Sequence, residues 1–483
     1  MAVERSFAAR VARAFLFSGV GQITAKGIFL VSLLAVLRRI QPEEFGLASI
    51  VLAIFAITEA LNELGLGPAL IQRKEIKRSE IDALFILSLG LSALIYIALA
   101  LGAPLLASFY DEPELTSLVR VYGLSLLFFP LFFVPRNLLM KRLAFGKLAI
   151  ADNLSLTMGS LVMLVLGFRG LGPWAIILGD LTHRFGQLVL CNVFSPYLPS
   201  LRGASYGPIG KMVKFGVYVT GSRLLYNFYT HADYLIVGKV FGTEALGVYT
   251  LAYRLLSDPI KTLATIVNQV AYPTFAALQD QLTRLRLYFF TIARFSMMLI
   301  GTIICVVVVF VDWLLVVGGY EPYLEATPLV RLMALAGLIR TVAPLVPQLL
   351  NAADRAKRNF YYSAAMAVVM PGAFLLGAQF GLVGVAASWS LLYPVVVLVL
   401  FGFGAQVLDI SLVSFLGRLF EALPRLLPVI ALTVGLRAAM IFFGAGDSPL
   451  VGSALLLLVL LVGVGIVWLF ERGTLQTVLR RGN

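Results

Sequence analysis

The residues best suited to chemistry are charged side chains within long hydrophobic segments. Arg254, Asp258 and Lys261 follow one another at intervals of four and three residues, which places them on one face of a helix. The two basic groups could hold a phosphate or pyrophosphate through charge-assisted hydrogen bonds. Alternatively, the acid could pair with both bases and merely tie helices together. The spacing therefore predicts either an anion-binding site or a structural group of ion pairs.

Further polar residues occur at helical spacing in neighbouring hydrophobic segments. Basic residues outnumber acids there, which favours an anionic ligand. The candidates for substrate binding are Lys26, Arg223, Asn227, Arg254, Asp258, Lys261 and Arg340. The candidates for a coupling cation or proton are Glu59, Glu63 and Asp233. For Glu59 and Glu63, the alternative is a position near the cytoplasmic end of a helix, facing headgroup water.

No combination of residues indicates an enzyme. Cys191 and Cys305 are far apart in hydrophobic segments, so neither a disulfide framework nor a cysteine metal site is expected. His183 and His231 each lack a second ligand at a metal-like spacing. The sequence also lacks a phosphate-binding loop of the kind that ATPases use. We expect no catalytic residue, no metal and no cofactor.

The elements that must position these residues are membrane-spanning helices. Of the 483 residues, 60% are hydrophobic and 13% are charged, whereas soluble domains contain about 25% charged residues. The net charge of +13 comes mainly from clusters between hydrophobic windows, not from one basic face that would bind nucleic acid. The sequence predicts an all-α integral membrane protein with about fourteen transmembrane helices.

The expected spans fall into two sets of six and a final pair. The first set covers residues 14–37, 45–66, 82–108, 115–135, 149–168 and 172–194. The second covers residues 212–238, 245–272, 289–317, 326–350, 360–379 and 383–403. The last two spans cover residues 424–443 and 449–470.

Basic residues indicate the orientation. With the N-terminus inside, about 24 of the 38 basic residues fall on the cytoplasmic side and about five outside. Both termini are therefore expected in the cytoplasm. No expected outside loop exceeds about 15 residues, which leaves no room for a catalytic domain there.

A weak internal repeat divides the chain into lobes. Residues 38–47 (RRIQPEEFGL) and 239–248 (KVFGTEALGV) both place an acid three residues before a glycine, with Glu43 matching Glu244 and Gly46 matching Gly247. We expect two pseudo-symmetric six-helix lobes at residues 1–200 and 201–405, with two additional helices and a cytoplasmic tail at 406–483. Lobes of this kind usually enclose a site near the membrane midplane and alternate its access.

Several segments resemble a known family. They are residues 34–47 (LAVLRRIQPEEFGL), 64–72 (LGLGPALIQ), 233–238 (DYLIVG), 246–249 (LGVY) and 252–254 (AYR). They are similar to signatures of the polysaccharide transporter family, the Wzx-like oligosaccharide flippases of the MATE-like MOP exporter superfamily. The resemblance implies a plasma (inner) membrane flippase for polyprenyl-pyrophosphate-linked oligosaccharide, acting in capsule, exopolysaccharide or O-antigen assembly. It implies a basic central cavity, and it implies partnership with membrane lipids and with a polysaccharide polymerase and export machinery.

Two alternatives stay open at this point. A flippase for the peptidoglycan lipid precursor or a multidrug exporter of the same superfamily would have the same helices, although an exporter of organic cations would favour acids over bases. A membrane polymerase or ligase acting on lipid-linked sugars is the alternative from another class. The short outside loops argue against it.

Overall fold

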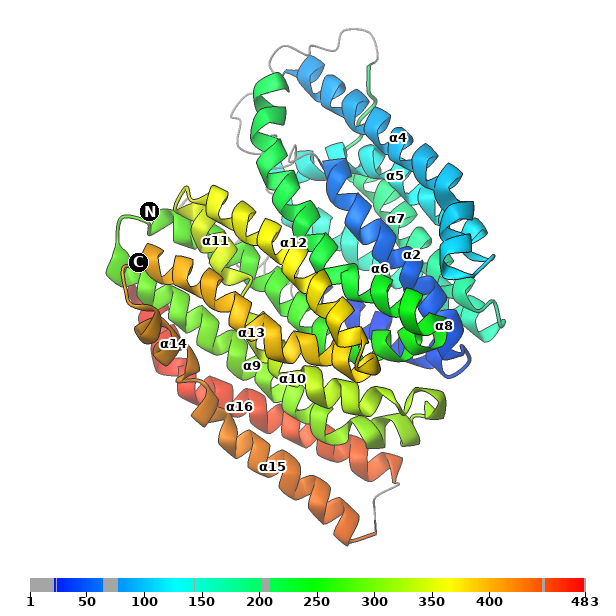
Figure 1. Ribbon diagram of the computed structural model, residues 1–483. Helices are drawn as coiled ribbons and strands as arrows, with labels where there is room; N and C mark the ends of the chain where they lie inside the picture. The colour runs from blue at the N-terminus through cyan, green and yellow to red at the C-terminus, as the bar shows by residue number, and fades with distance from the viewer. Residues whose placement is uncertain are drawn as a thin grey trace. The chain divides into compact units, whose positions relative to one another are not determined.

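The computed structural model describes residues 21–22, 24–63, 77–142, 144–200, 209–444 and 448–481. That part of the chain consists of helices joined by turns and short loops, with no strand, as the composition predicts (Figure 1). The chain forms two compact units, an N-terminal unit (Met1–Gly247) and a C-terminal unit (Val248–Asn483).

The N-terminal unit begins with an apolar helix at Thr24–Leu37. It continues through α2 (Pro42–Glu63), α4 (Arg78–Tyr110), α5 (Leu115–Lys141), α6 (Phe145–Phe168), α7 (Pro173–Phe194) and the first part of α8 (Ile209–Ala277). Two helical stretches join within α8 at Gly242, whose φ of 84° is a left-handed conformation that favours glycine. The expected spans 212–238 and 245–272 correspond to these two stretches.

Small residues let α6 and α7 pack closely. A side chain at Gly159 would meet the backbone carbonyl of Gly179, and one at Gly179 would meet Met163 and the carbonyl of Gly159. Close approach through small residues is typical of helix pairs in membranes, where dispersion contacts replace the hydrophobic effect. The contact fixes α7, which carries Asp180, Arg184 and Gln187.

Loops of the N-terminal unit interlock at one end of its helices. The Thr243 hydroxyl donates to Glu112 Oε1 at 2.8 Å, and the Trp174 indole donates to Glu114 Oε1 at 2.7 Å. Side chains at the two repeat-related glycines would overlap backbone reciprocally, Gly46 with the Thr243 carbonyl and Gly247 with the Pro42 carbonyl. Matching positions of the internal repeat therefore pack against each other.

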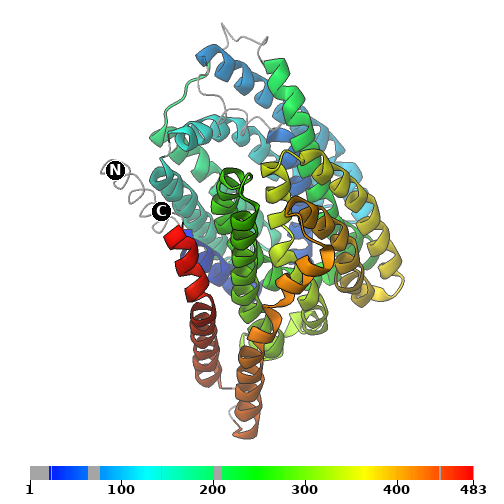
Figure 2. The same ribbon diagram turned by 90° about the vertical axis from the view of Figure 1, so that its left-hand side faces the viewer.

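The C-terminal unit is built around α9. It contains the remainder of α8, then α9 (Leu282–Val317), the 3₁₀ turn η1 (Glu321–Tyr323), α10 (Ala326–Val342), α11 (Leu345–Ala352), α12 (Ala356–Ala378), α13 (Gly381–Val407), α14 (Leu412–Phe420), α15 (Leu423–Phe442) and α16 (Pro449–Arg481). α15 and α16 lie side by side, as Figures 1 and 2 show. Both pack on α9, where Val306, Val429 and Val459 form a buried cluster.

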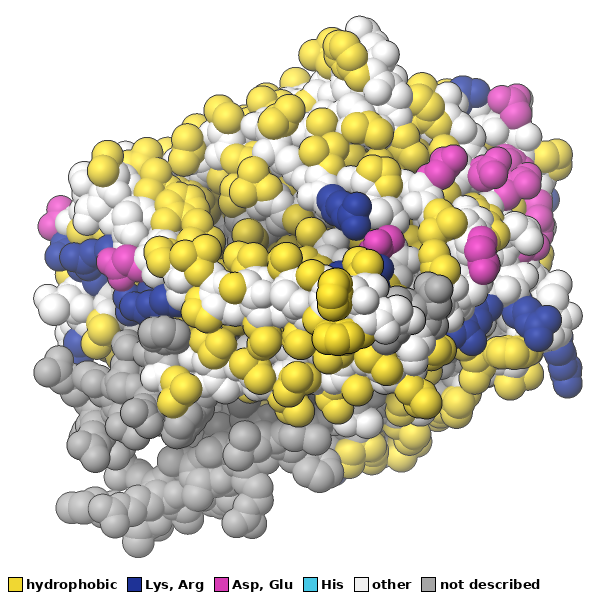
Figure 3. All heavy atoms as spheres, turned by 90° about the horizontal axis from the view of Figure 1, so that it is seen from below, with side chains coloured by type: hydrophobic (Ala, Val, Ile, Leu, Met, Phe, Trp, Pro, Cys, Tyr) yellow, Lys and Arg dark blue, Asp and Glu magenta, His cyan; other side chains and the backbone are white. Residues whose placement is uncertain are grey.

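The surface agrees with a membrane environment. Large hydrophobic side chains such as Leu105 (76% exposed) and Leu391 (70%) face outward, and hydrophobic side chains cover most of the face drawn in Figure 3. Among the described residues, ten helices are long and apolar enough to cross a membrane, and α8 counts once among them. The protein is thus a multi-pass membrane protein. The count of fourteen spans stays a prediction.

Candidate functional site

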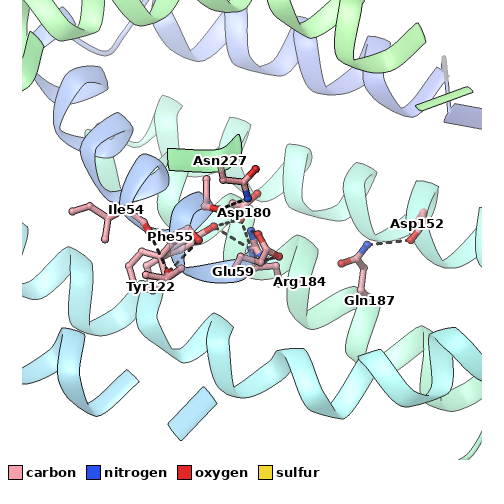
Figure 4. Close-up of polar contacts among 11 residues, drawn as sticks. Ile54, Phe55, Glu59, Tyr122, Asp152, Asp180, Arg184, Gln187 and Asn227 are labelled. Atoms are coloured by element: carbon pink, nitrogen blue, oxygen red, sulfur yellow. Dashed lines mark hydrogen bonds and ion pairs between the residues drawn. The ribbon is translucent and has the colours of Figure 1, made fainter. Parts of the chain in front are cut away.

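A network of charged and polar side chains joins three helices of the N-terminal unit, with Arg184 of α7 at its centre (Figure 4). The guanidinium donates to both carboxylate oxygens of Glu59 on α2, at 2.8 and 3.3 Å. It also donates to Asp180 Oδ2, one turn earlier on α7, at 2.8 Å and to the Tyr122 hydroxyl of α5 at 3.1 Å. One arginine therefore links α2, α5 and α7.

The buried side chain of Tyr122 is the fourth member of this network. Its hydroxyl donates to Asp180 Oδ2 at 2.5 Å, and the Phe55 ring meets its ring edge-on. The side chains of Glu59 and Asp180 keep 36% and 34% of their surface exposed. Both carboxylates are thus held by donors yet accessible, so a proton or cation can reach them.

Two predicted residues of α8 lie near Glu59. Asn227 donates its side-chain N–H to the Ala56 carbonyl of α2 at 2.8 Å, and Arg223 interacts electrostatically with Glu59. The structure therefore brings together Glu59, Arg223 and Asn227. The charge of Glu59 bears on how α2 is held to both α7 and α8, because a neutral carboxyl attracts arginine less than a carboxylate does.

The remaining predicted residues of the N-terminal unit are Asp233, Lys26 and Glu63. Asp233 is fully buried about 9 Å farther along α8 than Asn227, and its carboxylate accepts the backbone N–H of Tyr234 at 3.0 Å. Lys26 is half-buried on the helix Thr24–Leu37. The side chain of Glu63 lies outside the described residues.

A second group of polar residues in the N-terminal unit includes Gln187, which lies about one helical turn after Arg184 on α7. Arg136 of α5 pairs with Asp152 of α6 through its two terminal guanidinium nitrogens, one to each carboxylate oxygen. The longer of the two bonds measures 2.9 Å. Gln187 donates to the same carboxylate at 3.1 Å (Figure 4). Acid and base compensate each other here, which indicates a link between α5, α6 and α7.

In the C-terminal unit, Arg340 of α10 lies against two aromatic rings whose centres are 6.0 Å apart. Its guanidinium carbon is 4.9 Å from the ring centre of Tyr253 on α8 and 4.5 Å from that of Trp389 on α13. It also donates to the Tyr253 hydroxyl at 2.5 Å. The ammonium of Lys261 is 5.8 Å from the same tyrosine ring. Two predicted cations thus meet at one tyrosine, in distances typical of cation–π contacts.

A small pocket adjoins this group. It is lined by side chains of α8, α10 and α13, which include Tyr253, Ser257, Met333, Arg340 and Trp389. Arg254 and Asp258 are half-buried on the same stretch of α8, whereas Lys261 is exposed. The pocket, about 10 Å³ in volume, has room for about one water molecule. Among the described residues that line it, Arg340 is the one cationic side chain and lies beside the aromatic rings of Tyr253 and Trp389.

The sequence analysis missed several residues of both groups. Asp180 and Arg184 are spaced by four residues in a hydrophobic segment, the same signal that selected Arg254 and Asp258. Tyr253 belongs to the AYR segment at 252–254 that resembles the family. Nothing in the sequence singles out Trp389.

The model of the polysaccharide biosynthesis protein family matches residues 35–328. The chain belongs to this family. It is 26% identical over 379 residues to the lipopolysaccharide biosynthesis protein WzxC of Escherichia coli strain K12, covering 78% of this chain and 77% of the relative. It is 24% identical over 473 residues to the succinoglycan biosynthesis transport protein ExoT of Rhizobium meliloti strain 1021, covering 94% and 92%.

Solved structures share the fold. The lipid II flippase MurJ in an inward closed conformation aligns with 97% of this chain and 100% of its own, with a TM-score of 0.65 and 13% identity. An inward-facing multidrug resistance MATE family transporter of the MOP superfamily aligns with 84% and 98%, with a TM-score of 0.59 and 14% identity. The predicted fold class and the resemblance to the flippase family are confirmed, and so is the expectation of a transporter instead of an enzyme.

Proposed function

We propose that this protein is a flippase that moves a polyprenyl-pyrophosphate-linked oligosaccharide across the plasma membrane by alternating access. Membership of the polysaccharide biosynthesis family supports the substrate class. Relatives named for lipopolysaccharide biosynthesis and for succinoglycan transport support a role in building a surface or secreted polysaccharide. In this proposal both termini are cytoplasmic, and the product is passed to a polymerase and export machinery.

The observation that carries the proposal is the position of Arg340 against the rings of Tyr253 and Trp389. A basic residue in a membrane helix costs about 2.5–3.5 kcal/mol on insertion scales, so its presence calls for a function or a partner. Aromatic rings hold the guanidinium in place without a negative charge of their own. Arg340 and Lys261 are thus placed to attract a pyrophosphate, and the rings to contact the attached sugar.

The charge of Glu59 is the proposed point of energy coupling. Protonation of its carboxylate weakens its attraction for Arg184 and Arg223, which loosens α2 from α7 and α8. A proton or cation taken up there then changes helix packing in the N-terminal unit. Asp180 shares Arg184 with Glu59 and holds that arginine when Glu59 is neutral.

The test is polysaccharide export by cells that lack the native gene and carry one variant each. Arg340→Gln should lower export by about tenfold, the loss expected for one hydrogen bond to a charged group. The matched control is Arg358→Gln, because Arg358 also donates a 2.5 Å hydrogen bond, to Gln406, lies over an aromatic ring and is half-buried, yet stands at the start of α12 and does not line the pocket at Arg340. Membrane levels of both variants are measured by immunoblot.

Normal export by a well-expressed Arg340→Gln variant contradicts the anion site. A separate arm tests the closest alternative activity. If the wild-type protein sustains growth of cells depleted of their lipid II flippase, the peptidoglycan precursor becomes the better substrate. Uptake of lipid-linked oligosaccharide into proteoliposomes containing only this protein tests transport directly.

A further inference from the structure

Three charged residues of the C-terminal unit lie at one depth. Asp312 of α9, Arg331 of α10 and Arg437 of α15 each stand five residues from the end of their helix. At a rise of about 1.5 Å per residue, each is about 7.5 Å inside its helix end. In the predicted orientation these ends face the outside of the cell, so the three residues lie near the boundary between headgroups and hydrocarbon of the outer leaflet.

The two arginines share one carboxylate. Arg331 approaches Asp312 Oδ1 at 3.6 Å, and Arg437 approaches Oδ2 at 3.4 Å. Both separations exceed the roughly 2.7–2.9 Å of a strong charge-assisted hydrogen bond. Arg331 also reaches the Val308 carbonyl at 3.4 Å and Arg437 the Met440 sulfur at 3.8 Å. The Arg437 guanidinium carbon lies over the Phe310 ring, 5.7 Å from its centre. Two positive charges facing one negative charge leave a net charge of about +1 in this triad.

The triad opens to a hydrophobic surface. Arg331 is 50% exposed and Asp312 42%, whereas Arg437 is 16% exposed. Exposed hydrophobic side chains surround it on the same helices, including Val316, Leu335 and Val434. Figure 3, which looks onto the side where α15 lies in Figure 1, shows a small group of basic and acidic side chains within a hydrophobic field. A lipid next to such a surface can present its phosphate to the arginines while its tails cover the neighbouring hydrophobic residues.

We propose that the Asp312–Arg331–Arg437 triad binds the phosphate of an anionic phospholipid in the outer leaflet. Two guanidinium groups supply parallel donors that match the oxygens of a phosphate. Asp312 keeps them together and competes with the phosphate for the same donors. This site is separate in its residues from the group at Arg340 and does not depend on the proposed transport activity.

The test compares phosphatidylglycerol with phosphatidylcholine as ligands of the purified full-length protein, by native mass spectrometry and by thermal stabilisation in detergent. Arg331→Gln should weaken phosphatidylglycerol binding by about tenfold. Asp312→Asn should act in the opposite direction and strengthen binding, because both guanidiniums are then released to the phosphate. The matched control is Arg120→Gln, since Arg120 is also exposed five residues from the end of a helix, α5, with one contact to the Ala100 carbonyl.

The opposite effects expected of Arg331→Gln and Asp312→Asn on lipid binding distinguish a lipid site from a structural set of ion pairs. If Asp312→Asn leaves lipid binding unchanged or weakens it, the triad only ties α9, α10 and α15 together, and the proposal is wrong. Equal stabilisation by inorganic phosphate also overturns it, because the site then takes a free anion. Arg331 is half-exposed, so its substitution tests the proposal without the folding penalty expected for the more buried Arg437.

Discussion

Removing Arg184 should loosen the N-terminal unit more than any other single neutralisation of charge in that network. The Arg184→Gln variant leaves Glu59 and Asp180 without the guanidinium they share, and it removes a donor to the Tyr122 hydroxyl. The two carboxylates then lie in a helix bundle with less compensating charge. Because the arginine links α2 and α5 to α7, their packing weakens together.

The size of the effect follows from the contacts. Arg184 makes four hydrogen bonds, three of which reach other helices. Interhelical hydrogen bonds in membranes contribute about 0.6 kcal/mol on average, so these three give about 1.8 kcal/mol. Breaking a fully buried ion pair costs about 3–5 kcal/mol, and partial exposure of the carboxylates lowers that range. We expect a loss of about 3 kcal/mol in the free energy of unfolding.

The assay is unfolding of the purified protein in detergent, followed by circular dichroism and tryptophan fluorescence. Arg120→Gln is the control and should stay within about 0.5 kcal/mol of the wild type, because Arg120 is exposed. A triple variant that also carries Glu59→Gln and Asp180→Asn should recover more than half of the loss. An Arg184→Gln protein as stable as the wild type, or a triple variant no better than the single one, would refute the reasoning.

Two further outcomes are expected in the same assay. The Gly46→Ala variant should unfold at a lower temperature than the wild type, because the added methyl group would overlap the Thr243 carbonyl. Gly90→Ala is the control and should be neutral or slightly stabilising, because there is open space around Gly90. Equal effects of the two substitutions would contradict this account of the packing at Gly46. Burial and a 2.6 Å hydrogen bond to Asp82 raise the pKa of Tyr197. The stability that Tyr197→Phe removes should therefore be constant from neutral pH to about pH 10 and shrink above it. A contribution that stays unchanged well above that pH would contradict this account.

The positions of the long helices could be predicted from the sequence because hydrophobic length is a local property. The expected span 289–317 lies within α9, and the expected break between 238 and 245 contains Gly242. The short helix α14 was not predicted, since a segment of nine residues with a basic side chain has no membrane-span signal. The division of 326–350 into α10 and α11 at Pro344 was also not predicted.

Contacts between distant residues limited the prediction of the site. Glu59 and Arg184 are 125 residues apart, so their ion pair depends on the packing of α2 against α7 and not on spacing within either helix. Asp180 and Arg184 carry the same spacing signal as Arg254 and Asp258, but that spacing does not reveal the partners of Arg184 on α2 and α5. Charges in apolar helices are costly, which is why Glu59, Arg223, Arg340 and Lys261 stand out in the sequence. Their roles in substrate binding and ion coupling stay predictions.

Arg184 and Arg340 are both arginines in hydrophobic segments of the sequence, but the structure gives them different partners. Arg184 is held by two carboxylates, so an incoming anion has to compete with both, and the group responds most readily to a proton or cation. Arg340 is held by a hydroxyl and two aromatic rings, which position a guanidinium without competing as anions do. We therefore expect cation response from the group at Arg184 and anion binding from the group at Arg340, because the partners of an arginine, more than its presence in a span, decide which chemistry it can perform.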